Sequence, residues 1–240
     1  MNLHKKILCT AGVALLLSGT NLVAAEQSAK EIISKAYNYI GGMDQYAFDA
    51  IVTSEDATDA EAAKATRQTV SIKVDRPDKL RVDTKGDTKN RSTYVNDGLF
   101  TMMDHTYSYY GQLKTPKTID GTLDFIFEKF GIKAPMASLV YSDMGKRVKF
   151  KKSKYFGTMD VAGTECDYVA FKSRAGEVHI WIATGDKPLV KTYAIIDTAA
   201  EGNHRMDTSL IWDTNPKISA NDFIFKAPKG AAKISVEPAQ

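Results

Sequence analysis

Histidines and cysteines are the side chains of this sequence best suited to acid–base, nucleophilic or metal chemistry. The four histidines are His4, His105, His179 and His204, and none of their spacings matches His-x-x-x-His or His-Glu-x-x-His. Zinc sites on a helix use such spacings because they place two imidazoles on one face. The sequence therefore predicts no metal site.

His179 has the setting closest to that of an acid–base residue. In the expected strand it alternates with Glu177 and Trp181, so a carboxylate shares the strand face of the imidazole. No third group that would orient the imidazole is evident, and Asp104-His105 falls at an expected hairpin turn. We interpret these histidines as structural, and a hydrolase that uses His179 with acidic side chains is the less favoured alternative.

Motifs for nucleophilic catalysis and nucleotide binding are absent from the sequence. It contains no Gly-x-Ser-x-Gly, no P-loop and no Gly-x-Gly-x-x-Gly. Glycoside hydrolysis needs two facing carboxylates, which a sequence alone does not exclude. We predict no catalytic residue, no cofactor and no enzymatic activity.

The first residues have the layout of a secretory signal peptide. Lys5 and Lys6 precede an apolar run at 7–17, and Val23-Ala24-Ala25 places small residues at the −3 and −1 positions of a cleavage site. The apolar run is about half as long as the roughly 20 residues that a membrane-spanning helix needs. We expect residues 1–25 to be removed, no transmembrane segment in the mature chain, and a location in the periplasm of a Gram-negative bacterium.

The mature chain, residues 26–240, is expected to form a single domain with a nearly neutral surface. Loss of Lys5 and Lys6 changes the formal net charge from +3 to +1, because residues 1–25 contain no acidic side chain. Nucleic-acid binding usually needs a clustered basic face, so we exclude that class of partner. Cys166 becomes the one remaining cysteine, and its apolar strand setting indicates a buried small side chain.

The hydrophobic pattern predicts a helix followed by a meander of strands. Ser28 and Glu31 form a capping box, apolar residues follow at helical spacing, and Gly41-Gly42 ends the helix. Alternating apolar residues then indicate strands up to Leu113, with a loop at 54–65. Asn96-Asp97-Gly98 between two of these strands is a strong hairpin signal.

A helical insertion and a second set of strands complete the expected fold. The segment 119–141 has helical spacing and is apolar on most sides, which indicates helices that are buried or cover a cavity. Strands resume between 154 and 213, and Phe223 with Phe225 begins a final strand or tail. We predict a mainly β fold with α: an unclosed, strongly curved antiparallel β-barrel of about eleven strands, with an N-terminal helix and a helical insertion covering the concave face.

Several turn and strand motifs recur along the expected domain. They are Arg76-Pro77-Asp78-Lys79-Leu80, Asn96-Asp97-Gly98, Gly163-x-x-Cys166-Asp167, Ile180-Trp181-Ile182, Gly185-Asp186-x-Pro188-Leu189, Trp212-Asp213 and Phe223-x-Phe225-x-x-Pro228-x-Gly230-Ala231. Together they resemble the DUF2092 family of predicted periplasmic proteins, over roughly residues 28–236. The sequence departs from the family at Tyr168, where a histidine is common, and at 177–179, where Asp-Trp-Gln is common.

That family in turn resembles the group that contains the lipoprotein carrier LolA and its receptor LolB. The resemblance implies an unclosed β-barrel whose hydrophobic concave face is plugged or covered by helices. Relatives of that architecture bind lipids or shuttle acyl chains. The resemblance therefore implies a lipid or lipoprotein acyl group as the ligand.

Bulky aromatic side chains are the remaining signal. They either fill an ordinary barrel core or line a cavity for an acyl chain. We favour the second interpretation, a non-enzymatic binder or carrier in which 119–141 is a mobile lid. The alternative is an envelope sensor or interaction module with a packed interior, an exposed apolar patch and an envelope protein as partner. The ligand-cavity candidates are Tyr37, Phe48, Tyr109, Phe125, Phe127, Phe130, Trp181 and Trp212.

Overall fold

The computed structural model describes residues 28–55, 66–87, 89–132, 134, 136–149, 152–173, 176–197 and 204–238. The expected signal peptide and most of the loop expected at 54–65 lie outside these residues. Among the described residues, no helix combines the length and the apolar composition that a membrane crossing requires.

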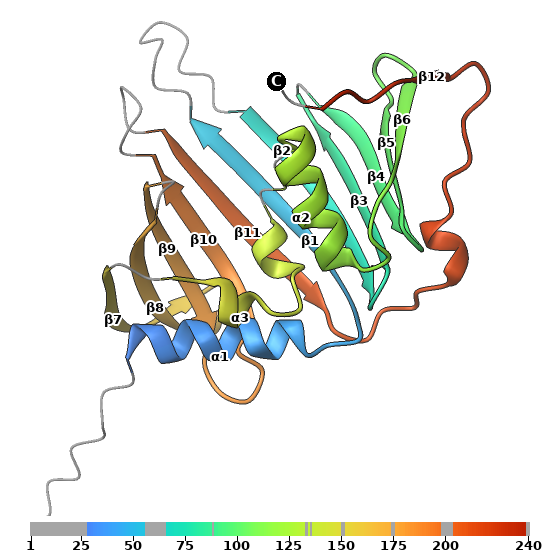
Figure 1. The fold of residues 1–240 in the computed structure, drawn as a ribbon. Coiled ribbons are helices and arrows are strands. Elements are labelled where there is room, and N and C mark those ends of the chain that lie inside the picture. Colours follow the sequence, from blue (N-terminus) through green and yellow to red (C-terminus); the bar gives the residue numbers. More distant parts are fainter. Residues whose placement is uncertain are drawn as a thin grey trace, which may run out of the picture.

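One 12-stranded sheet runs through the described part of the chain, in the order β12-β6-β5-β4-β3-β2-β1-β11-β10-β9-β8-β7. Neighbouring strands are antiparallel, except that β12 pairs in parallel with β6. Figure 1 shows a strongly curved, open sheet with the helices on its concave side. The predicted fold class is confirmed. The strands are β1 (Gln45–Glu55), β2 (Thr66–Asp75), β3 (Lys79–Gly86), β4 (Asn90–Asn96), β5 (Leu99–Asp104), β6 (Tyr109–Lys114), β7 (Lys152–Val161), β8 (Thr164–Ser173), β9 (Gly176–Ala183), β10 (Val190–Ile196), β11 (Arg205–Asp213) and β12 (Ala232–Ile234).

Helix α1 (Ala29–Gly41) begins and ends as the sequence predicts. The Ser28 hydroxyl accepts a hydrogen bond from the Glu31 amide at 3.3 Å, and the Glu31 carboxylate accepts one from the Ser28 amide at 2.9 Å. At the other end, a Cβ on Gly41 would overlap the Ser142 carbonyl. A glycine there lets α1 lie tightly against the loop around Ser142, along one end of the sheet (Figure 1).

The first strands form the predicted meander from β1 to β6. The hairpin between β4 and β5 turns at Asp97, with φ 44°, and Gly98, with φ 76°. Two successive left-handed residues are what a tight two-residue hairpin turn requires, and this confirms the Asn96-Asp97-Gly98 prediction. Tyr46, Phe48 and Val52 alternate along β1 and are buried against the helices, which defines the concave face.

Helix α2 (Ile119–Phe130) crosses the concave face of the meander (Figure 1). The Thr118 hydroxyl caps it by accepting from the Gly121 amide at 3.1 Å. Ile126 is buried toward the sheet, whereas Phe127 is 56% exposed. Of the two expectations for this apolar segment, α2 is therefore not buried on all sides, because it keeps one face in solvent, but it does cover a cavity.

The rest of the insertion contains little regular helix. It consists of the 3₁₀ turn η1 (Ala137–Leu139) and the short helix α3 (Met144–Arg147). Of the helical segment expected up to residue 141, the described part after α2 forms only η1. Leu139 and Val140 are buried, so tertiary contacts rather than helical hydrogen bonds hold this part of the chain on the sheet.

A β-bulge separates the two faces of β7. The register between β7 and β8 shifts between Tyr155 and Thr158, and Gly157 between them has φ 94°. Before the bulge, strand alternation places Tyr155 against the concave core and Phe156 on the convex face, where its ring stacks on Tyr168 with centroids 4.6 Å apart. Phe156 is therefore an aromatic ring on the outer surface near this edge of the sheet.

The C-terminal segment returns across the convex face of β2–β6. Of the two forms expected after Phe223, a final strand or an extended tail, the structure has the tail: Phe223 ends the 3₁₀ turn η2 (Ala220–Phe223), and the last strand, β12, begins only at Ala232. Phe223 is 1% exposed, and the Phe225 ring packs between Tyr94 and Tyr110 at 5.5 and 5.0 Å. Packing of these two rings on the sheet takes the place of strand pairing in this tail.

Candidate functional site

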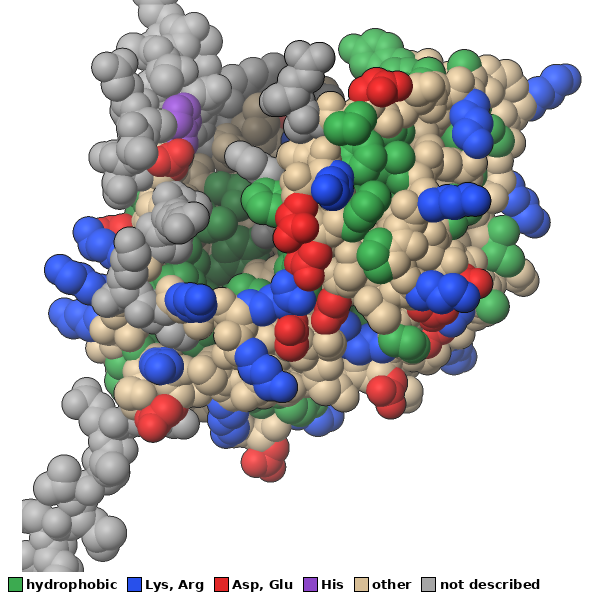
Figure 2. Space-filling model, viewed as in Figure 1, with side chains coloured by type: hydrophobic (Ala, Val, Ile, Leu, Met, Phe, Trp, Pro, Cys, Tyr) green, Lys and Arg blue, Asp and Glu red, His purple; other side chains and the backbone are tan. Residues whose placement is uncertain are grey.

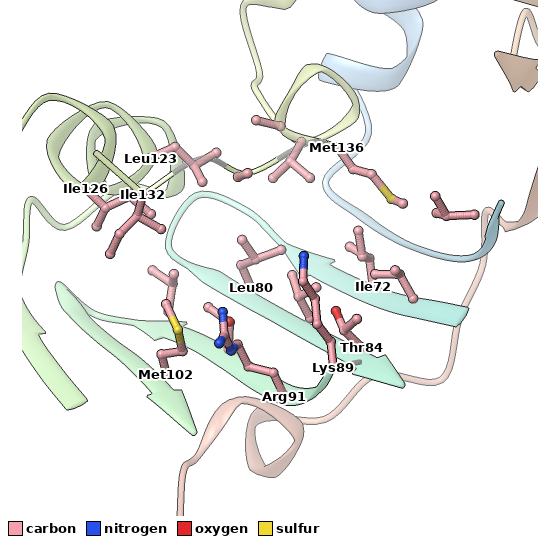
Figure 3. Close-up of a pocket in the computed structure, with 18 of the residues that line it drawn as sticks. Ile72, Leu80, Thr84, Lys89, Arg91, Met102, Leu123, Ile126, Ile132 and Met136 are labelled. Atoms are coloured by element: carbon pink, nitrogen blue, oxygen red, sulfur yellow. The ribbon is translucent and has the colours of Figure 1, made fainter. Parts of the chain in front are cut away.

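A cavity lies between the concave face of β1–β5 and the helical insertion; we name it the first cavity. Its volume is about 210 Å³. Figure 3 shows Ile72 and Leu80 rising from the sheet toward Leu123 and Ile126 of α2. The lining is predominantly aliphatic and drawn from both layers, as in sites that hold a hydrocarbon.

Strand register explains why these side chains meet. Ile72 of β2 lies opposite Val82 of β3, and Val95 of β4 lies opposite Leu80. Because side chains alternate between the two faces, every second residue of these strands points to the concave face. The sequence therefore lines the floor of the first cavity by simple period-two alternation.

A second cavity, of about 290 Å³, lies between α1, the η1–α3 segment and strands β8–β10. Tyr37 of α1, Leu139 and Met144 lie on one side of it, and Phe171 and Ile180 on the other. Burial raises the pKa of Tyr37 to about 12, so this phenol is neutral at ordinary pH.

Tyr193 of β10 lines both cavities. Its side chain is buried, and burial raises its pKa. Its hydroxyl interacts with that of Thr208, its partner in the β10–β11 register, and neither has a further hydrogen-bond partner in the described part of the chain. The Tyr193 hydroxyl therefore has capacity left for a hydrogen bond with a guest.

The surface is hollowed beside α2, on the side of β10 and β11. Figure 2 shows hydrophobic side chains on the floor of this hollow, with charged side chains around it. Hydrophobic side chains also gather over α2 itself. The concave side of the sheet is thus open to a guest from this face.

A charged cluster joins α2 to α3 beside the cavities. The Arg147 guanidinium donates to both Asp124 carboxylate oxygens, at 2.8 and 3.1 Å. The Tyr141 hydroxyl donates to the same carboxylate at 2.9 Å, and Arg147 lies 4.1 Å from the centre of the Tyr141 ring. We call these three residues the Asp124–Arg147 latch, because they tie the two helices of the insertion together.

Comparison with known families decides the affiliation of this chain. A model described as "Predicted periplasmic protein (DUF2092)" matches residues 29–237. The chain belongs to the DUF2092 family. The resemblance stated from the sequence is confirmed, and the periplasmic localisation agrees with the family description. No curated protein matches the sequence.

Solved structures resemble this DUF2092 protein at low sequence identity. An uncharacterized conserved protein from Thermus thermophilus has a TM-score of 0.53 and 9% identity, over 87% of this chain and 99% of that chain. A LolA superfamily protein from Nitrosomonas europaea has a TM-score of 0.39 and 6% identity, over 83% and 98%. The lipoprotein LppX from Mycobacterium tuberculosis has a TM-score of 0.43 and 9% identity, over 78% and 96%. The first of these shows a shared fold.

Three of the predicted ligand-cavity residues, Tyr37, Phe48 and Trp212, lie on the concave side of the sheet in this DUF2092 protein. Tyr37 lines the second cavity. Phe48 and Trp212 face the concave side as cross-strand partners, with ring centroids 4.7 Å apart and Tyr46 next to them. The Trp212 indole donates to the Val190 carbonyl at 2.7 Å. The rings of Phe48 and Trp212 therefore fill the core and line neither cavity.

The other candidates lie apart from one another. Phe125 and Phe130 contact each other on α2 at 5.7 Å, and both are half-buried. Tyr109 of β6 stacks on Tyr107 at 6.0 Å. Trp181 is on the convex face, where it stacks on Tyr168 at 4.6 Å. Phe127 is exposed, so the structure does not bring the eight predicted residues together around one cavity.

The histidine of the hydrolase alternative lies outside both cavities. His179 is on the convex face, where its Nδ1 lies 2.7 Å from the Tyr168 hydroxyl and its Nε2 is 3.8 Å from the Glu177 carboxylate. The two positions that depart from the family pattern are therefore in contact. No carboxylate or imidazole is among the described residues that line the cavities.

His105 makes a contact that the sequence did not indicate. Its Nε2 lies 2.8 Å from the Ser92 hydroxyl, which also lies 2.6 Å from an Asp83 oxygen. A catalytic triad needs the acid on the far side of the imidazole, whereas here the acid contacts the serine. Ser92 is 5% exposed and lines neither cavity.

Sequence reasoning missed the polar residues of the first cavity. Lys89, which immediately precedes β4, and Arg91 line it together with Thr93 and Val95 of β4. The signal was the period of two, since residues 89, 91, 93 and 95 alternate along β4 and the residue before it. Selecting bulky aromatic side chains instead of following strand faces overlooked these two charges.

Proposed function

We propose that this protein is a non-enzymatic periplasmic binder or carrier of a lipid or lipoprotein acyl chain, held between the helical insertion and the sheet. The observation that carries the proposal is the first cavity, which is aliphatic and about 210 Å³ in volume. A dry apolar cavity of about 150 Å³ is already large enough to hold benzene. A filled interior at this place would have removed the basis for a carrier.

The second cavity extends the space available to a long chain. Its volume is about 290 Å³, and Tyr193 belongs to the walls of both cavities. Taken together, the two cavities reach the range of about 300–1,000 Å³ that is usual for small-molecule sites. A guest that displaces or turns the Tyr193 side chain would occupy both.

The expected affinity follows from the burial of methylene groups. Each buried methylene contributes about 0.8 kcal/mol, so a chain of about fourteen contributes roughly 11 kcal/mol before the costs of binding. Lost rotational and translational freedom offsets several kcal/mol of this. We expect dissociation constants near the micromolar range, as suits a carrier that must release its cargo.

Native mass spectrometry tests the proposal directly. The protein is purified gently from its own periplasm, its intact mass is measured, and bound material is extracted and identified. The expected result is an added mass that corresponds to an acyl lipid or an acylated protein. A clean unliganded mass, together with no binding of added acyl lipids, would contradict the proposal.

A cavity-filling variant locates the ligand. Val82 is half-buried on β3 and lines the first cavity, so Val82→Phe places a ring inside it. Affinity for an acyl ligand should fall at least tenfold. The matched control is Ile211→Phe on β11, where the side chain is 64% exposed and makes no wall of either cavity. Equal binding by both variants would place the ligand elsewhere.

A second candidate function is an interaction module for another envelope protein. The observation that favours it is the outer surface of β7, where Phe156 is 47% and Met159 46% exposed. Exposed apolar side chains grouped at a sheet edge are typical of protein contacts. Phe156→Ser/Met159→Ser should abolish a defined cross-linked complex in the periplasm and leave lipid binding intact. If Val82→Phe, which fills the first cavity, abolished this cross-linked complex instead, the protein contact would depend on the cavity, and this result would favour the carrier.

A further inference from the structure

Two basic side chains stand on the concave face at one end of the first cavity. Lys89 immediately precedes β4, and Arg91 lies within it opposite Thr84 of β3. Both line the cavity, and Figure 3 shows them rising from the sheet among apolar neighbours such as Leu80 and Met102. An apolar cavity with cations at one end fits a ligand with an apolar tail and an anionic head.

The charges at this end do not cancel. Asp104 is the acidic partner of Arg91, with its carboxylate 3.4 Å from the guanidinium Nη2. The other Asp104 oxygen accepts from the backbone amides of Thr106 and Tyr107, at 3.0 and 3.2 Å. Among the described residues, Lys89 contacts no carboxylate within 4.0 Å. One positive charge therefore remains uncompensated.

The guanidinium of Arg91 also has unused hydrogen-bonding capacity. Its Nε is buried and has no hydrogen-bond partner in the described part of the chain. The contact of Nη2 with Asp104 is long, at 3.4 Å. A buried N–H without a partner is costly, and a carboxylate or another planar anion would satisfy it together with Nη2, which lies on the same edge of the guanidinium.

We propose that the first cavity binds a free long-chain fatty acid, with its carboxylate on Arg91 and Lys89 and its hydrocarbon chain beneath α2 toward Tyr193. The inference rests on the proposed function and narrows its ligand to one class. The planar guanidinium fork matches the two oxygens of a carboxylate, and the ammonium of Lys89 adds a second contact to the same head.

The dimensions of the site support a single chain. Five strand intervals separate β4, which carries the cations, from β10, which carries Tyr193. At about 4.8 Å per interval, the path along the sheet is roughly 24 Å long. A cavity of about 210 Å³ over such a path is narrow, so it accommodates one hydrocarbon chain rather than the several chains of a diacyl lipid.

The test compares head groups on a constant chain. The delipidated mature protein is loaded with the uncharged dye Nile red, which is then displaced by palmitate, by monopalmitoylglycerol or by palmitoyl-lysophosphatidylglycerol. We expect palmitate to displace the dye at a concentration at least tenfold lower than the uncharged ester. Salt should weaken palmitate binding and leave the ester unaffected, because an ion pair at a partly exposed site is screened.

Matched variants assign the effect to the basic pair. Lys89→Gln/Arg91→Gln should lower palmitate affinity at least tenfold and leave the uncharged ester unchanged. The control, Lys85→Gln/Arg67→Gln, removes the same charges from exposed residues that line neither cavity. It should bind palmitate as the wild type does, and thermal unfolding checks that both variants are folded.

The outcomes separate this inference from the proposed function. If no acylated ligand displaces the dye, the carrier function itself fails. If palmitate and the uncharged ester bind equally, and the basic pair can be removed without loss, the carrier remains and the fatty-acid inference is overturned. Tighter binding of the lysophospholipid, with the same dependence on Lys89 and Arg91, would also overturn it and assign a phosphate head instead.

Discussion

The hydroxyl of Tyr46, on β1, donates a hydrogen bond of 2.7 Å to the backbone carbonyl of Leu139 in η1, across a sequence separation of 93 residues. Tyr46 is fully buried, and Arg76 donates to the same phenolic oxygen at 3.2 Å. The bond attaches the middle of the helical insertion to the floor of the sheet. Any movement of the insertion as a lid therefore has a fixed point at Leu139.

Removal of that hydroxyl should destabilise the protein. Tyr46→Phe leaves the Leu139 carbonyl, in a buried residue, without this partner, and the free energy of unfolding should fall by about 1–3 kcal/mol. Urea denaturation measures the change. The control is Tyr107→Phe, because Tyr107 is 72% exposed and its substitution should have little effect. Equal stability of the two variants would show that the bond to Leu139 is not stabilising.

Breaking the Asp124–Arg147 latch should change the dissociation rate of a bound ligand more than it changes the free energy of unfolding. Arg147→Met removes the partner of Asp124 at a half-exposed site, where an ion pair contributes about 1 kcal/mol or less. Without it α2 is free to move away from α3, so a bound acyl ligand should dissociate several times faster. Stopped-flow displacement measures this rate, and Asp124→Asn completes a double-mutant cycle. An unchanged dissociation rate in all three variants would rule out α2 as a gate.

The contacts that Asp222 makes between the C-terminal segment and the sheet should weaken in acid, which lowers the free energy of unfolding. The hydrogen bond from Lys73, followed by that from the Ser219 amide, lowers the pKa of Asp222 from 3.8 to about 2. Since the folded-state pKa is the lower one, the stabilisation is present above pH 4 and is lost as the pH falls toward 2. After solvent screening it amounts to roughly 1 kcal/mol. Asp222→Asn should flatten the dependence of unfolding free energy on pH between 4 and 2, and an unchanged slope would contradict this assignment.

Cys166 should react slowly in the folded protein. The thiol is buried, and burial raises its pKa, so little nucleophilic thiolate forms near neutral pH. Alkylation by iodoacetamide at pH 8 should be at least tenfold slower than in urea-unfolded protein. Fast alkylation of the folded chain would indicate that β8 opens locally or that the thiol is activated.

Local patterns in the sequence predicted the helix cap and the hairpin, whereas strand pairing between distant segments depends on the three-dimensional path of the chain. The capping box at Ser28 and the hairpin at Asp97-Gly98 depend on neighbouring residues, so both were predictable. The parallel pairing of β12 with β6 joins Ala232 to Tyr109 and depends on the path of the whole C-terminal segment. No local pattern encodes such a pairing, and the alternation at Phe223 and Phe225 left open whether a strand or an extended tail begins there.

In the candidate site, too, some features were predictable from local sequence and others were not. Aromatic size was a poor guide, because Phe48 and Trp212 fill the core and Trp181 lies outside it. The first cavity is lined instead by aliphatic residues such as Ile72 and Leu80. The alternation of the sequence predicts which face of the sheet these side chains occupy, but it does not predict how far that face lies from α2. The empty volume depends on sheet curvature, which a sequence of alternating residues does not specify.

The two ends of the open sheet limit how copies of this protein can assemble. At one end β12 is three residues long; at the other, β7 has ten residues and no further strand beside it in the described part of the chain. A filament grows by strand pairing when each subunit offers two usable edges, and this chain offers one long edge. Pairing β7 with β7 of a second copy would use both long edges at once, so the product is a closed dimer and growth stops there.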